Sequence, residues 1–134
     1  QDGEFFARVL MLADKAVFVS KSRIYYRTGE YLTVSKASSE KKVASMLNTF
    51  VSYKNHALAR EDSKRVREAL SINFTLFIYL YGNQFPKLYK RAKEEIKALG
   101  VGYILKNEPP RVISLCKVIG FDYFMTIRRL LLGR

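Results

Sequence analysis

The stretch SSEKKVASMLNTFVSYKNHALA, residues 38–59, decides the fold class of this chain. Its apolar side chains recur every three or four positions, which places them on one face of a helix. Ser38 or Ser39 can cap the first turn, because a serine oxygen accepts a backbone N–H that has no partner there. The basic side chains fall away from most of the apolar stripe, so we expect a solvated face made of Lys41, Lys42, Lys54 and Arg60.

Two more helices are predicted directly downstream. The first spans residues 62–81, is capped by Asp62 or Ser63, and is almost wholly apolar over its last 12 residues or so. A run of about 12 apolar residues is too short to cross a bilayer and is typical of a core or interfacial helix. Gly82 and Asn83 end it, because either residue tolerates the left-handed conformation of a helix C-terminus.

Pro86 opens the next helix, at about 86–99, because a proline in the first turn loses no hydrogen bond. Its narrow apolar stripe is Leu88, Ala92, Ile96 and Leu99. Neither an internal repeat nor a low-complexity linker interrupts residues 38–99, so we expect these three helices to pack as a compact bundle.

The residues from Pro109 onward admit two interpretations. A Pro-Pro pair opens a helix, Gly120 interrupts it, and residues 121–132 combine aromatic and aliphatic side chains with a pair of arginines. Such a helix can lie at a membrane surface, with rings at the headgroup boundary and cations on anionic lipid. The membrane-contact residues would then be Phe121, Phe124, Arg128 and Arg129. The same pattern also fits a C-terminal helix that completes the core.

Composition and charge narrow the class of protein. With 134 residues, 49% hydrophobic and 13% aromatic, the chain has the size of one domain and enough apolar material for a core. The net charge of +12 is uneven, with an excess of +1 in residues 1–35, +7 in 36–100 and +4 in 101–134. A basic surface attracts nucleic acid, anionic lipid or phosphorylated substrates.

Single copies of two residue types exclude several kinds of site within this chain. Cys116 is the only cysteine, so no intramolecular disulfide forms; its apolar neighbours favour a buried thiol and a reducing compartment. His56 is the only histidine, which excludes a His-based metal cluster and a Ser-His-Asp triad.

The N-terminal residues, QDGEFFARVLMLADKAVFVSKSRIYYRTGEYLTVS at 1–35, have a different pattern. An Asp-Gly-Glu opening leads into an apolar run, then a β-branched segment, then Tyr-Tyr-Arg. We expect a helix near residues 3–13 and short strands near 15–20 and 23–28. Asp2, with Glu4 in the first turn, suits any helix N-terminus, because carboxylates there face free amides and the positive end of the helix dipole.

This order of elements resembles the end of the donor-binding domain in family 2 glycosyltransferases of the GT-A type. Gln1-Asp2 falls on the family's acidic pair, Phe5 to Arg8 on its Phe-x-x-Arg helix, and Ile24–Arg27 on its strand ending in Tyr-Tyr-Arg. The chain departs from the family in having Gln1 where Glu is usual, and Gly29 where the family often has His. The resemblance covers about a quarter of the chain.

The resemblance implies a mainly α chain in two parts. Residues 1–35 would be the C-terminal end of an α/β catalytic domain, and residues 36–134 a helical C-terminal extension. The parent enzyme would be an inverting glycosyltransferase that moves a sugar from a nucleotide-sugar donor to a cell-surface polysaccharide or lipid-linked acceptor. Asp2 would be the catalytic base, and Tyr26 and Arg27 would bind substrate.

The resemblance also implies a divalent cation, Mg or Mn, in the full-length parent. This chain has no Asp-x-Asp pair to hold it, so we expect no cofactor and no turnover here. The expected location is the cytoplasm, at the inner face of the membrane.

A second class of function is a basic helical module that binds nucleic acid. Tyr25, Tyr26, Tyr53 and Tyr89 could stack on bases while the cations follow the phosphates. No recognised nucleic-acid motif accompanies them, so this class is the weaker one. A homo-oligomer formed through the C-terminal apolar face is a further expectation.

Overall fold

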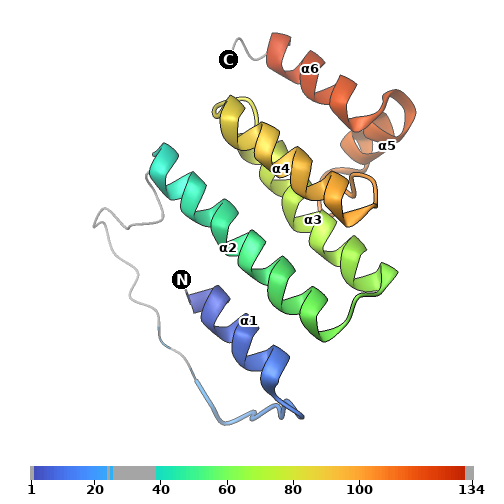
Figure 1. Cartoon of the computed structure of the whole chain (residues 1–134). Coiled ribbons are helices and arrows are strands. Elements are labelled where there is room, and N and C mark those ends of the chain that lie inside the picture. The colour runs from blue at the N-terminus through green and yellow to red at the C-terminus, as the bar shows by residue number, and fades with distance from the viewer. Residues whose placement is uncertain (1, 24, 26–38, 132–134) are drawn as a thin grey trace.

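The computed structural model describes residues 2–23, 25 and 39–131, and this part of the chain contains six helices and no strand (Figure 1). The helices are α1 (Asp2–Leu12), α2 (Glu40–Arg60), α3 (Lys64–Tyr81), α4 (Pro86–Leu99), α5 (Pro110–Ile119) and α6 (Phe121–Leu131). Figure 1 shows α1 beside α2, with α3 and α4 next and α5 and α6 at the far end. The helical prediction is confirmed.

The helix boundaries follow the local signals, with two corrections. Ser39 lies at the N-cap of α2, but its side chain makes no capping hydrogen bond. Ser63 caps α3 by accepting the N–H of Val66 at 3.4 Å, and Gly100 ends α4 in the left-handed region at φ 68°. Gly82 ends α3 at φ −59°, which is right-handed, so the left-handed ending predicted for it is wrong. Its missing side chain still matters, because a Cβ atom there would lie 2.5 Å from the carbonyl oxygen of Ile78.

The core lies where α3 meets α2 and α4, as the bundle prediction required. Phe74 and Ile78 of α3 and Leu47 of α2 are fully buried. Phe50 of α2 meets the rings of Phe74 and Phe77 edge-on, at 6.2 and 6.3 Å between centroids. Edge-to-face rings at this distance add to the stability that burial provides.

Two polar side chains inside the core hold the connection that follows α4. Ser71 and Thr75 are fully buried on α3. Ser71 donates to the carbonyl oxygen of Gly102 at 2.7 Å, and Thr75 accepts the N–H of Ile104 at 3.1 Å. The backbone after α4 therefore finds partners on α3 without forming a helix or a strand.

Helix α6 completes the core along one face. Phe121 and Met125 are buried, Phe121 lies 4.7 Å from the ring of Tyr103, and Phe124 stacks on Tyr79 at 6.3 Å. Its last turn is open to solvent, since Leu130 and Leu131 are 77% and 80% exposed. The interpretation of this helix as part of the core is confirmed for Phe121 and Met125, and membrane contact stays a prediction. In the described ranges, no helix combines the length and hydropathy that a bilayer crossing requires.

The strand predicted near residues 15–20 is wrong. This segment is irregular and ends in a turn in which the N–H of Ser22 donates to the carbonyl oxygen of Val19. Val17 and Phe18 are 70% and 90% exposed. A β-branched run becomes a strand only beside another strand that pairs its backbone, and residues 2–23, 25 and 39–131 contain none. The second predicted strand, 23–28, falls largely outside the described residues.

The solvated face predicted for the cations of α2 needs correction at Lys42, which is half-buried, and at Lys54. Lys54 forms an ion pair with Glu95 of α4, and their side chains are only 18% and 16% exposed. It therefore joins two helices of the bundle. Lys41 and Arg60 are exposed as predicted.

Candidate functional site

The candidate catalytic residue, Asp2, is the first residue of α1, and α1 packs against α2. The next residue, Gly3, lies so close to α2 that a Cβ atom there would be 2.5 Å from the hydroxyl oxygen of Tyr53. Glycine in a helix costs about 0.5–1 kcal/mol relative to alanine. At position 3 its small size lets the start of α1 approach the Tyr53 ring.

Glu4 ties the same end of α1 to α2. Its Oε1 atom accepts a hydrogen bond from the Ser52 hydroxyl at 3.0 Å and lies 3.1 Å from Nε of Arg8 and 3.6 Å from Nε2 of His56. The Glu4 side chain is 26% exposed, so these contacts are partly shielded from water. The first turn of α1 is therefore fixed by a close approach and a hydrogen bond.

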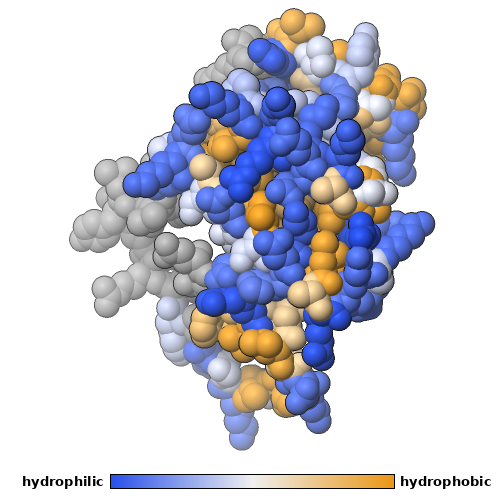
Figure 2. Space-filling view, in the orientation of Figure 1, coloured by the Kyte–Doolittle hydropathy of each residue, from blue (hydrophilic) through white to orange (hydrophobic). Residues whose placement is uncertain are grey.

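The opposite face of α1 is apolar and uncovered. Phe5 and Phe6 are 54% and 59% exposed, and their rings meet at 5.5 Å. Val9 and Leu10 continue this surface, called here the outer face of α1. Figure 2 shows hydrophobic side chains gathered over the lower part of α1, amid a largely hydrophilic surface. An exposed apolar patch on a folded chain is typical of a site that contacts another protein surface, a membrane or a ligand.

The other residues predicted from the resemblance, Gln1, Tyr26 and Arg27, lie outside the described residues, so their roles stay predictions. The described residues do not form a site for a divalent cation, because they include no group of three carboxylate, thiol or imidazole side chains placed to hold one. The chemistry available at the start of α1 is that of a carboxylate.

A second polar site, missed by sequence reasoning, joins α4 to α6. One carboxylate oxygen of Asp122, Oδ1, accepts hydrogen bonds from the Tyr89 hydroxyl, the Lys93 ammonium and the Tyr103 hydroxyl, each at 3.0 Å. These four residues are called here the Asp122 cluster. Three donors that are 19 to 33 residues away from Asp122 cannot be paired from spacing alone, and no local signal indicated them.

Electrostatics in the Asp122 cluster follow from burial and these hydrogen bonds. Burial alone would raise the pKa of Asp122, but the hydrogen bonds from Lys93 and the two tyrosines outweigh it and hold the pKa below its ordinary value. Burial, helped by the bond to Asp122, raises the pKa of Tyr103 to about 12. The cluster therefore keeps one ionised carboxylate with neutral phenols at physiological pH.

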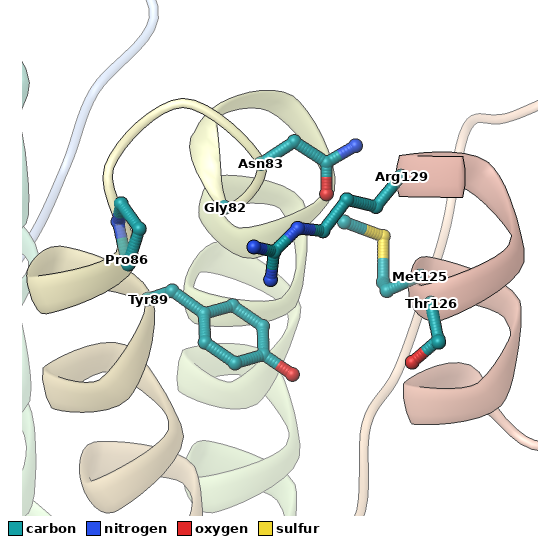
Figure 3. Close-up of a pocket in the computed structure, with 7 residues that line it drawn as sticks. All are labelled: Gly82, Asn83, Pro86, Tyr89, Met125, Thr126 and Arg129. Atoms are coloured by element: carbon teal, nitrogen blue, oxygen red, sulfur yellow. The ribbon is translucent and has the colours of Figure 1, made fainter. Parts of the chain in front are cut away.

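The predicted membrane-contact residues separate into inward and outward positions. Phe121 is buried and Phe124 is half-buried, as described above. Arg128 lies over the Tyr79 ring, 4.2 Å from its centroid, and donates to the carbonyl oxygen of Tyr79. Arg129 is exposed and extends toward Tyr89 beside a hollow of about 80 Å³ between α6 and the α3–α4 turn (Figure 3).

The tyrosines predicted to stack on bases are also divided. Tyr25 is 86% exposed, whereas Tyr53 is held beside Gly3 and Tyr89 belongs to the Asp122 cluster. Tyr26 lies outside the described residues. The two held rings are half-buried.

Comparison with known proteins gives no match of any kind to this chain: neither a family model, nor a curated protein, nor a solved structure.

Proposed function

We propose that this chain is the C-terminal part of an inverting glycosyltransferase, and that its helical region holds the helix that carries the catalytic base. The proposal draws on the residues that resemble the family: Gln1-Asp2 followed by Phe5-Phe6-Ala7-Arg8. The observation that carries it is the attachment of α1 to α2 at the turn next to Asp2. Gly3 against Tyr53 and Glu4 on Ser52 fix the position of that turn.

A catalytic base must be held in place, because a displacement of about 1 Å can cost a hundredfold in rate. In the proposed reaction, Asp2 accepts the proton of the acceptor hydroxyl while its oxygen attacks the anomeric carbon of the donor sugar. The nucleoside diphosphate leaves as the new glycosidic bond forms. The start of a helix favours the ionised carboxylate that this role needs.

The outer face of α1 supports the same proposal. Phe5, Phe6, Val9 and Leu10 offer an apolar surface on the side of α1 that faces away from α2. The donor-binding part of a catalytic domain would cover it, so that α1 becomes an internal helix between that domain and the helical region. The acceptor proposed for the parent is a cell-surface polysaccharide or a lipid-linked sugar.

We also propose contact with the inner face of a membrane, through a different set of residues from the one predicted from the sequence. Arg129, Leu130 and Leu131 at the end of α6 are exposed and combine a cation with aliphatic groups. They are the residues that can meet anionic lipid, since Phe121 and Arg128 are engaged within the fold.

Replacing Asp2 by Asn in the full-length enzyme tests the catalytic role. We expect turnover to fall by a hundredfold or more with donor binding unchanged, because the amide cannot accept the proton. Asp14→Asn is the matched control, since Asp14 is an exposed carboxylate beyond the end of α1. Near-normal turnover of the Asp2→Asn enzyme would leave Asp2 as a helix-capping residue and remove the catalytic proposal.

A further inference from the structure

A groove of about 370 Å³ lies between α1, α2 and α3, away from the Asp122 cluster. Helix α2 forms its floor, and the C-terminal half of α1 and the N-terminal half of α3 form its walls. Pockets that bind small molecules typically measure about 300–1,000 Å³. The groove is therefore large enough for a compact ligand.

Small side chains create this groove. Each helix contributes an alanine to its lining, Ala7 from α1, Ala57 from α2 and Ala69 from α3. Elsewhere in the bundle, the contacts between helices are filled by Phe74, Phe77 and other large side chains. Water binds poorly in a hollow lined by methyl groups, so this part of the groove favours an apolar occupant.

The remaining lining has an apolar part and a cationic rim. Met11, Val66 and Leu70 make the apolar part, and Arg60 and Arg65 lie at the rim. Arg65 is paired with Glu61 at 3.0 Å, whereas Arg60, at the end of α2, has no ion-pair partner within the described ranges. His56, 40% exposed, adds a polar group on the same helix. The rim thus carries two guanidinium groups and one carboxylate, Glu61, whose ion pair is with Arg65, so Arg60 is the cation available to an anionic ligand.

We propose that this groove binds an amphiphile made of one apolar chain and an anionic head. The chain lies against Met11, Val66 and Leu70, and the head meets the guanidinium of Arg60. A phosphate head and a carboxylate head share this chemistry. This site does not depend on the glycosyltransferase proposal, because Asp2 takes no part in it.

The test is a calorimetric titration of the protein with dodecyl phosphate, below the concentration at which the probe forms micelles. We expect one saturable site per chain. Dodecanol, which lacks the charge, and inorganic phosphate, which lacks the tail, should each bind at least tenfold more weakly. Dodecanoate in a fourth titration distinguishes a carboxylate from a phosphate as the preferred head.

Two substitutions locate the site. Ala69→Phe, at an exposed position on the groove wall, should fill the hollow and abolish saturable binding, and Arg60→Gln should weaken it about tenfold by removing a charged hydrogen bond. Ala98→Phe and Arg91→Gln are the matched controls on exposed positions of α4, outside the groove, and should bind like the wild type. Ala7→Leu fills the groove from α1 and replaces Ala69→Phe should that variant lose its helical circular dichroism.

Three results would each overturn the proposal: no saturable binding of dodecyl phosphate, equal binding of inorganic phosphate, or wild-type binding by both groove-filling variants. Equal losses in Arg60→Gln and Arg91→Gln would also overturn it, because they would assign the binding to the general positive charge of the chain.

Discussion

Replacing Glu4 by Ala should loosen α1 from the rest of the fold without unfolding the bundle. Glu4 accepts the Ser52 hydroxyl at 3.0 Å and is 26% exposed. A hydrogen bond to a charged group contributes about 1.5–3 kcal/mol, and partial exposure favours the lower end, so we expect a loss of about 1.5 kcal/mol. The ion pair with Arg8 adds little, because Arg8 is 50% exposed.

Amide hydrogen exchange measures this effect directly, because it reports the free energy of local opening. A loss of about 1.5 kcal/mol should speed exchange in α1 roughly tenfold, since 1.4 kcal/mol corresponds to a factor of 10. The most protected amides of α3 exchange only when the whole core unfolds, an opening that includes release of α1, so they should speed up by the same factor while still exchanging more slowly than those of α1.

Two variants separate the contributions at this contact. Ser52→Ala removes the donor and should reproduce the effect of Glu4→Ala, whereas Glu4→Gln keeps an acceptor and should speed exchange in α1 only about twofold. Unchanged exchange in α1 of Glu4→Ala would show that the contact contributes nothing. Protection of α1 as strong as that of buried α3 in the wild type would show that α1 does not open separately, and either result refutes the reasoning.

Three other predictions concern the attachment of α6 and of the connection before it. Thr75→Val should lower the free energy of unfolding by about 2 kcal/mol in urea titrations, because the N–H of Ile104 loses its buried partner. Thr75→Ser should keep this hydrogen bond and lose only a methyl group, which lowers the free energy of unfolding by about 1 kcal/mol. Equal stability of Thr75→Val and wild type would contradict this prediction. The pKa of Asp122 is lowered in the folded chain, so the cluster's contribution to stability is complete above the ordinary carboxyl pKa and is lost as pH falls through the folded value below about 4. The stability difference between wild type and Asp122→Asn should therefore be constant near neutral pH and shrink below about pH 4; a difference that persists in acid would argue against an ionised carboxylate. Arg129→Gln should weaken sedimentation with anionic vesicles and leave the unfolding midpoint unchanged, whereas Arg128→Gln should lower the free energy of unfolding by about 1–2 kcal/mol through loss of its contacts with Tyr79. Equal, negligible sedimentation with anionic and neutral vesicles would remove the membrane contact.

Periodicity predicted every helix of the described structure, because spacing of apolar residues and residues at helix ends are local properties of the chain. The same kind of signal failed at residues 15–20. A β-branched run specifies a strand only with a neighbouring strand, and periodicity carries no information about that neighbour. Val17 and Phe18 therefore remain exposed.

Long-range polar contacts were beyond sequence reasoning for a similar reason. Lys54 had the spacing of a solvated residue, but its partner Glu95 is 41 residues away on α4. Ser71 and Thr75 interrupt an apolar run, and only the path of the chain after α4 explains their burial. The candidate base, Asp2, was found from its neighbours in sequence, whereas the contacts of Glu4 with Ser52 and His56 required the fold.

The contact of Gly3 with Tyr53 makes these two positions a single steric unit. A methyl group at position 3 would lie 2.5 Å from the tyrosine hydroxyl oxygen but 3.8 Å from the ring carbon that bears it, so the hydroxyl alone stands in its way. Alanine at position 3 is thus compatible with phenylalanine at position 53, whereas alanine beside the tyrosine requires the tyrosine hydroxyl to move. In related sequences we therefore expect alanine at position 3 to occur together with phenylalanine at position 53, while phenylalanine at position 53 can accompany either residue at position 3.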